Sequence, residues 1–300
     1  MSVYSFSVFL LFLLISPVAR ADSSSPTLAA YYDRQMAIVA GKVYAWKRRD
    51  APVLVPLAGR QVGVGRDRYY VLTNNGELIA FDAVAGPHAM LMNGVARFAA
   101  GHSGVLAIRN DQTLWWLAGG TKKHLADGAV TAAVGDGANY YITQSGDLFV
   151  KGLAHRGQYG DGRLKPTQHF IKTASAAADI TAHTGHAIML KANGDVFGTG
   201  GNIYGPVGKH GLGDKAIRWS RIMSGAKAIA TGSSHSFAIR RDDTLVAWGS
   251  DYGIMPTPVL RDVVAVAAGS RTAIALKSDN TLWQWNRAQK PVPILKRVGK

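Results

Sequence analysis

The sequence contains no cysteine, so it can form neither a disulfide framework nor a thiolate metal site. It also lacks long hydrophobic runs: no segment beyond the N-terminus reaches 18 uncharged apolar residues, and we expect no transmembrane anchor. Gly-x-Ser-x-Gly, His-Glu-x-x-His and phosphate-binding-loop motifs are missing as well. The sequence therefore points to no catalytic residue and to no cofactor.

Acidic residues are scarce, since 19 Asp and Glu stand against 34 Lys and Arg. The resulting net charge of +15 favours anionic partners and salt-sensitive association. The alternative is that the charge serves only solubility.

Residues 1–21 have the pattern of a secretory signal peptide. Residues 8–15 form an apolar core that is too short to span a bilayer, and Ser16-Pro17 ends it. Ala19-Arg20-Ala21 has the small-x-small pattern of a cleavage site, which predicts a cut after Ala21 and a secreted or periplasmic chain of residues 22–300. The first seven residues carry no Lys or Arg, which departs from the pattern. A buried first strand is the alternative.

The rest of the chain repeats one unit of short apolar strands separated by turns. Each copy has an anchor position after its first strand, and the copies align without gaps on Gly65, Gly101, Gly135, His183, Gly232 and Gly269. Ten residues after each anchor stands a pair that suits a two-residue hairpin turn: Asn75-Gly76, Asp111-Gln112, Ser145-Gly146, Asn193-Gly194, Asp242-Asp243 and Asp279-Asn280. An earlier, less regular copy has Asp33 at its anchor and a shortened tip at Gly41-Lys42.

Seven copies at a spacing of 34 to 49 residues predict an all-β, seven-bladed β-propeller. The copies lie at about 28–59, 60–94, 95–128, 129–174, 175–225, 226–262 and 263–300. A fourth strand follows the third, and its prolines place it at the outer edge, where a missing N–H costs little. How the ring closes stays open.

Residues 228–239, AIATGSSHSFAI, are followed by Trp248-Gly249, and residues 152–162 read GLAHRGQYGDG. These motifs, with a less complete GGNIYG at 200–205, resemble the regulator-of-chromosome-condensation repeat family, in an exported bacterial form. The resemblance covers about residues 28–300 and implies a seven-bladed propeller that acts by binding proteins. Five copies lack the full loop, so no interface residue carries over.

The two long copies provide the candidate contact residues, because loops on a rigid scaffold commonly bind partners. Their extra residues fall in 152–170 and 200–221, and Tyr, Trp and Arg are enriched in interface hot spots. The candidates are His155, Arg156, Tyr159, Arg163, Lys165, Tyr204, Lys209, His210, Arg218, Trp219 and Arg221. The alternative is that these loops pack between blades while their charges are merely solvated.

Other candidate signals are weaker. His183 and His186 are too few for a metal site, and we expect none. Trp46, Trp248 and Trp285 share one repeat position and belong to the core, whereas Trp219 lies outside it.

The first functional hypothesis is an exported, non-enzymatic, monomeric propeller that binds an unidentified, acidic protein as a scaffold, inhibitor or regulator. Nucleic acid is disfavoured by the export signal. The alternative is an envelope carbohydrate-binding or hydrolytic propeller with a site at the central channel. Clustered carboxylates or arginines at the channel mouth would favour the alternative, and a flat aromatic and basic patch would favour the first hypothesis.

Overall fold

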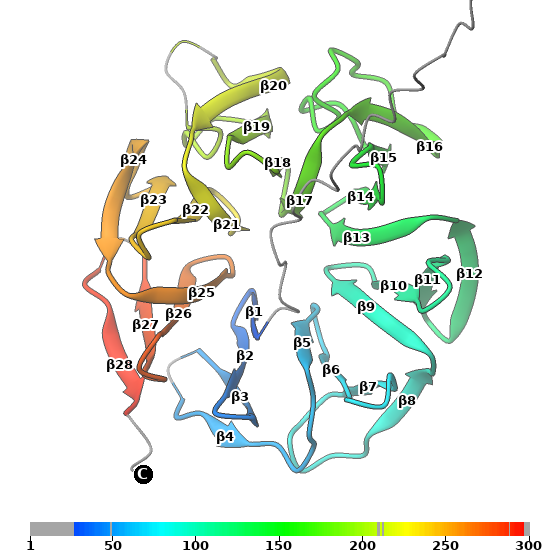
Figure 1. The fold of residues 1–300 in the computed structure, drawn as a ribbon, viewed down its shortest axis with the longest axis vertical. Coiled ribbons are helices and arrows are strands. Elements are labelled where there is room, and N and C mark those ends of the chain that lie inside the picture. Colours follow the sequence, from blue (N-terminus) through cyan, green and yellow to red (C-terminus); the bar gives the residue numbers. More distant parts are fainter. Residues whose placement is uncertain (1–26, 49, 209–210, 212, 288, 297–300) are drawn as a thin grey trace, which may run out of the picture.

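The computed structural model describes residues 27–48, 50–208, 211, 213–287 and 289–296, so the predicted signal peptide lies outside the described residues. Over these residues the chain forms seven four-stranded antiparallel sheets arranged around a central axis (Figure 1). The predicted all-β, seven-bladed propeller is confirmed. The described residues contain no helix, and hence none long and apolar enough to cross a membrane.

Each blade consists of four consecutive strands. Blades 1 to 3 contain β1 (Leu28–Tyr31), β2 (Arg34–Val39), β3 (Lys42–Lys47) and β4 (Val53–Leu54); β5 (Gln61–Val64), β6 (Tyr69–Leu72), β7 (Leu78–Phe81) and β8 (Ala89–Met92); and β9 (Val95–Ala100), β10 (Val105–Arg109), β11 (Leu114–Ala118) and β12 (Thr121–Ala126). The first strand of each blade lies nearest the axis and the fourth lies at the rim (Figure 1).

Blades 4 to 7 repeat this order with longer outer strands in blades 4, 5 and 6. They contain β13 (Ala129–Val134), β14 (Ala138–Thr143), β15 (Leu148–Gly152) and β16 (Thr167–Ala174); β17 (Ala177–Ala182), β18 (His186–Lys191), β19 (Val196–Gly201) and β20 (Lys215–Met223); β21 (Ala226–Thr231), β22 (His235–Arg240), β23 (Leu245–Gly249) and β24 (Gly253–Leu260); and β25 (Val263–Ala268), β26 (Thr272–Lys277), β27 (Leu282–Asn286) and β28 (Val292–Leu295).

The hairpin tips between second and third strands differ in detail from the prediction. In blades 2 to 7 only the second residue of each predicted pair has positive φ, for example Gly76 at +83° and Asn280 at +64°. Thr73 and Glu77 still pair through a backbone hydrogen bond, so the loop has three residues and ends in the left-handed conformation. Only blade 1 has a two-residue turn, and it falls at Ala40-Gly41 rather than Gly41-Lys42, because Val39 pairs with Lys42.

The hydrophobic core is divided among the seven interfaces between blades. One cluster of buried side chains lies at each interface, which explains why the strands are apolar on both faces. Trp46, Trp248 and Trp285 are buried in these clusters as the repeat position predicts. Each blade therefore depends on its two neighbours for burial.

The ring closes by side-chain packing between blades 7 and 1, and within residues 27–296, as far as the structure describes them, no strand is exchanged between these blades. Leu28 and Trp46 of blade 1 pack with Ile274 and Leu282 of blade 7. The Trp46 indole Nε1 donates a 2.8 Å hydrogen bond to Gln284 Oε1, and both side chains are buried. The closing interface thus combines an apolar cluster with side-chain hydrogen bonds, as other interfaces between blades do.

Candidate functional site

The propeller has two faces that carry different loops. Because neighbouring strands are antiparallel, the turns after first strands and the loops after third strands emerge on one side, which we call the loop face. The hairpin tips and the connections between blades emerge on the other side, the tip face. The loops predicted to bind a partner therefore lie on the loop face.

The loop of blade 4, residues 153–166, folds against the outer strand of blade 5. Asp161 and Arg218 form a β-bridge, the Gly162 N–H donates to the Ile217 carbonyl, and the Trp219 N–H donates to the Gly160 carbonyl. The two long segments of the sequence are therefore brought together.

The loop of blade 5 contacts blade 6 in the same manner. The Pro206 carbonyl accepts hydrogen bonds from Trp248 Nε1 at 2.8 Å and from Ser236 Oγ at 3.0 Å. The inner parts of both loops thus fill gaps between blades, as the alternative expectation held.

Tyr159 is not a surface residue, which corrects its assignment as a contact residue. Its side chain is fully buried in the blade 4–5 core, and its hydroxyl donates to the Gly152 carbonyl at 2.5 Å. The same hydroxyl accepts a hydrogen bond from the Thr167 N–H, and burial raises its pKa. Tyr159 holds the loop in place, and a large aromatic ring in a glycine-rich loop gave no sequence signal to separate the two roles.

Trp219 is only partly a surface residue. Its ring packs against Gly160 and the blade 4–5 core. Arg221 lies apart from the other predicted contact residues, because its guanidinium pairs at 2.7 Å with Asp195 near the tip face. This contact lowers the pKa of the Asp195 carboxyl. Lys209 and His210 lie outside the described residues.

The remaining predicted residues, together with the exposed Leu164, Ile203 and Ile217 that were not predicted, form a surface that we call the blade 4–5 patch. Its apolar members include Ile203 and Tyr204, which are 70% and 63% exposed. The Arg156 side chain lies against Gly185 and Gly201 of blade 5, which places it beside these two residues. The patch comprises His155, Arg156, Arg163, Leu164, Lys165, Ile203, Tyr204, Ile217 and Arg218.

Charge within the blade 4–5 patch is mostly basic. Arg163 Nε lies 3.2 Å from Asp161 Oδ2, and an Arg218 guanidinium N–H donates to the Asp161 backbone carbonyl at 3.4 Å. Asp161 is thus the carboxylate that locks the loop rather than one that neutralises the whole surface. An aromatic and basic surface on a rigid frame is the arrangement that the first hypothesis requires.

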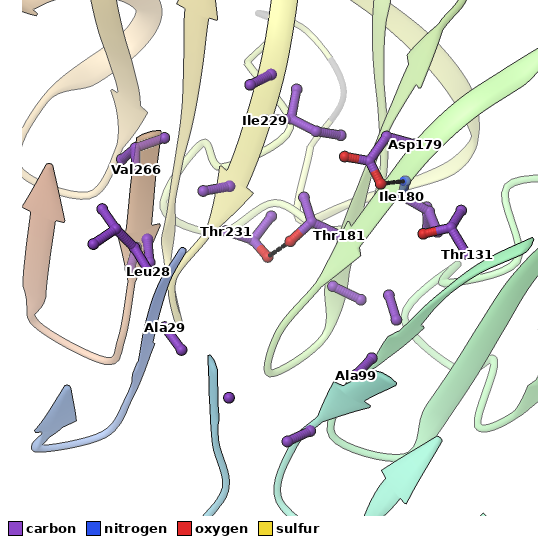
Figure 2. Close-up of a pocket in the computed structure, with 18 of the residues that line it drawn as sticks. Leu28, Ala29, Ala99, Thr131, Asp179, Ile180, Thr181, Ile229, Thr231 and Val266 are labelled. Atoms are coloured by element: carbon purple, nitrogen blue, oxygen red, sulfur yellow. Dashed lines mark hydrogen bonds between the residues drawn. The ribbon is translucent and has the colours of Figure 1, made fainter. Parts of the chain in front are cut away.

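The first strands of all seven blades line a central channel of about 580 Å³. Its wall is mainly alanine, valine and threonine, and Figure 2 shows the Thr181 and Thr231 hydroxyls in hydrogen-bond contact across neighbouring blades, 2.8 Å apart. Asp179 accepts a hydrogen bond from the Ile180 N–H, and burial raises its pKa while Arg97 opposes the rise. The wall is therefore lined mainly by small side chains and carries few charges.

Sequence reasoning missed a cluster at the loop-face end of the channel, which we call the mouth cluster: Tyr31, Tyr32, His102, Asp136 and His183. The Tyr31 hydroxyl crosses from blade 1 to blade 4 and donates to Asp136 Oδ1 at 2.6 Å. Its ring stacks on His183, with 4.9 Å between centroids. Burial, together with the Asp136 contact, raises the pKa of Tyr31.

The sequence contained a signal for two members of the mouth cluster, His102 and Asp136. The residue after the anchor is polar in all seven copies: Arg34, Arg66, His102, Asp136, Thr184, Ser233 and Ser270. A ring of polar residues at one repeat position indicates a polar rim at one end of the channel. Among the described residues no three His, Asp or Glu side chains are placed to hold a metal ion.

Comparison with known proteins agrees with this fold. A sequence profile described as "Regulator of chromosome condensation (RCC1) repeat" matches residues 226–253. A "Secretion-regulating guanine nucleotide exchange factor" of Bos taurus is 30% identical over 123 residues, 39% of this chain and 26% of that protein. A "Bifunctional serine/threonine-protein kinase/NEDD4-like E3 ubiquitin-protein ligase" of Dictyostelium discoideum is 26% identical over 149 residues, 43% of this chain and 8% of that protein. The chain thus spans about a quarter or less of these relatives.

Among solved structures, the crystal structure of Prp20p from Saccharomyces cerevisiae superposes with a TM-score of 0.74. It shares 15% sequence identity, and the match covers 84% of this chain and 83% of that chain. At that level of identity the likeness shows a shared fold. The chain therefore shares the propeller fold of Prp20p and contains one matched regulator-of-chromosome-condensation repeat, at residues 226–253.

Proposed function

We propose that this chain is an exported, non-enzymatic propeller that binds a protein partner through the blade 4–5 patch. The proposal rests mainly on the exposure of Ile203 and Tyr204, which lie on the blade 5 loop that Pro206 fixes against blade 6. Arg156, from the blade 4 loop, lies beside them. Preorganised loops lose little conformational entropy on binding, so their contacts contribute more fully to affinity.

The similar proteins support a binding role. The structure of Prp20p is described together with its binding properties to Gsp1p and histones, and the bovine relative is named as an exchange factor. Both descriptions concern action on other proteins. The basic members of the blade 4–5 patch favour an acidic partner surface, since complementary charge raises association rates and specificity.

The central channel supports its alternative role less well. Asp136 at the mouth is engaged by Tyr31, and Asp179 lies near the start of its strand, towards the tip face. Two carboxylates at opposite ends of a channel do not make the paired acid and base that glycoside hydrolysis uses.

The test is a comparison of partner capture by three forms of the chain at about 150 mM salt, where exposed charges are screened beyond about 8 Å. The patch variant carries alanine at Arg156, Ile203, Tyr204 and Arg218. The control carries alanine at Lys42, Asn110 and Arg261, which are exposed on the tip face.

We expect one partner to be retained by the natural chain and the control and lost by the patch variant. N-terminal sequencing of the bait recovered from expressing cells should begin at Asp22. Retention by all three forms, or capture of nothing, argues against the proposal, and a bait that still begins at Met1 argues against export.

A further inference from the structure

A second concave surface lies between blades 2 and 3 on the loop face, away from the blade 4–5 patch. This groove encloses about 380 Å³ and is bounded by residues 66–68, 101–104 and 117–122, with Tyr70 and Leu91. We call it the blade 2–3 groove. Its volume falls in the range of small-molecule sites.

The groove exists because the loop after the third strand of blade 2 does not extend over the junction with blade 3. In blades 4 and 5 the loop after the third strand covers the junction with the next blade. In blade 2 the corresponding residues 82–88 turn back instead: Val84 packs into the blade 1–2 core, and the His88 ring lies 4.9 Å from that of Phe81. The junction with blade 3 is left open.

The charged side chains that line the groove are mainly cationic. Arg66, Arg68 and Lys122 line it, and Asp67 is the single carboxylate among the lining residues. Arg66 Nε lies 3.9 Å from Asp67 Oδ2, and both side chains are largely exposed, so this pair contributes little. Arg68 pairs at 3.0 Å with Asp82, which is outside the lining and also exposed. The lining thus contains three cations and one carboxylate, and Asp82 pairs with Arg68 from outside the lining.

Two further polar groups lie beside these cations. His102 Nδ1 is buried at the groove and has no hydrogen-bond partner among the described residues. A buried ring nitrogen left without a partner destabilises the fold, and a ligand that pairs with it removes that cost. The Tyr70 hydroxyl also lines the groove, and burial raises its pKa, so it stays protonated as a donor.

Two glycines of the groove leave its backbone uncovered. A Cβ built at Gly119 or Gly120 has nothing within 4 Å, whereas the corresponding positions at Gly101 and Gly104 are filled by Val134 and Trp116. A compact ligand can therefore approach the main chain closely.

We propose that the blade 2–3 groove binds an oxyanion, a carboxylate or phosphate group, held by the Arg66 and Arg68 guanidinium groups with His102 as a further partner. Guanidinium groups match carboxylate and phosphate oxygens in bidentate geometry. The proposal stands independently of the blade 4–5 patch, because the two surfaces share no residue.

The experiment is a titration of the folded, isotope-labelled chain with inorganic phosphate, followed by amide resonances at constant ionic strength. Acetate serves as a free carboxylate, and a tetraglutamate peptide serves as a carboxylate carried on a protein chain. We expect saturable shifts at Gly101, Ser103, Gly104 and Gly120. Tighter binding of the peptide than of acetate identifies a protein segment as the source of the group, and equal binding identifies a small molecule.

The variant with Arg66→Gln and Arg68→Gln should weaken phosphate binding about tenfold or more, because each removes a charge-assisted pair. The control is Arg271→Gln, which removes an exposed arginine from the loop face of blade 7. Shifts that grow linearly without saturation, spread over the basic surface, or persist in the double variant overturn the proposal. If the double variant does not fold, Lys122→Gln is tested against the same control.

Discussion

At the scale of single residues, three buried histidines on blades 5 and 6 link stability to pH. His186 Nε2 lies 3.0 Å from Ser236 Oγ, and His183 and His235 each have an Nε2 without a hydrogen-bond partner among the described residues. Burial lowers the pKa of His183 and His235 to about 4 and that of His186 to about 3. All three are therefore neutral at neutral pH.

Acidification should destabilise the fold through these residues. The pKa of such a histidine is lower in the folded state than its ordinary value of 6.5, so the unfolded state takes up the proton first as pH falls. Its contribution to the free energy of unfolding is therefore complete above pH 6.5 and is lost as pH falls towards 4. His183 alone accounts for about 3 kcal/mol over that interval. Urea unfolding at about pH 7 and about pH 4.5 measures the loss.

The matched variants are His235→Gln, which removes one buried titration, and His155→Gln, which removes an exposed histidine. The first should lose less stability on acidification than the natural chain, and the second should lose as much. Equal pH dependence in all three would contradict the assignment.

Residue roles were predicted unevenly. The buried positions of Trp46 and Trp285 follow from repeat periodicity, because equivalent positions meet equivalent neighbours. Tyr159 and Tyr31 could not be placed that way. Their roles depend on partners 7 and 105 residues away, Gly152 and Asp136.

At the scale of elements, the loop of blade 4 depends on one close backbone approach. Gly157 has φ of +86°, and a Cβ built there would lie 2.6 Å from the Ala216 carbonyl oxygen of β20. Gly128, between blades 3 and 4, has a similar φ of +74° with nothing within 4 Å. Alanine substitutions at the two positions therefore distinguish the cost of backbone strain, which both share, from the cost of a steric clash, which only Gly157 has.

Gly128→Ala should lower the free energy of unfolding by about 1 kcal/mol, the strain of a left-handed alanine. Gly157→Ala should cost about 3 kcal/mol, because the added methyl group also pushes the loop off β20. Chemical denaturation of the two variants measures the difference. Equal losses would mean that the loop moves away without resistance.

Element boundaries were predictable where local chemistry fixes them. The tips with Gly76, Gly146 and Gly194 show the expected positive φ, since glycine adopts it without steric penalty. The number of residues in the tips of blades 2 to 7 was mispredicted, because a residue pair such as Asn75-Gly76 serves both two-residue and three-residue turns. Whether a loop packs against the following or the preceding blade depends on contacts with those blades. A local sequence pattern carries no information about such contacts.

At the scale of the whole molecule, Gln284 joins the last blade to the first. Its Oε1 accepts from Trp46 Nε1, and its Nε2 donates to the Arg48 carbonyl at 2.7 Å. Both bonds cross the interface between blades 7 and 1. This side chain therefore connects residues 236 and 238 positions apart in the sequence.

Gln284→Leu should reduce the free energy of unfolding by about 2 to 3 kcal/mol, because it leaves the buried indole N–H and the Arg48 carbonyl without partners. Gln289→Leu, at an exposed position in the same blade, is the control and should change little. Thermal unfolding of both compares them directly. If Gln284→Leu lost no more stability than the control, apolar packing alone would close the ring.

Because every blade takes all four strands from one continuous stretch of the chain, no blade is distinguished by containing both an early and a late strand. A gene that began at any of the seven boundaries would encode the same set of sheets. Growth by copying one unit likewise requires no matching change at the ends. The architecture can thus diverge blade by blade, with long loops in two units and an open junction in another, while the circle that holds them stays the same.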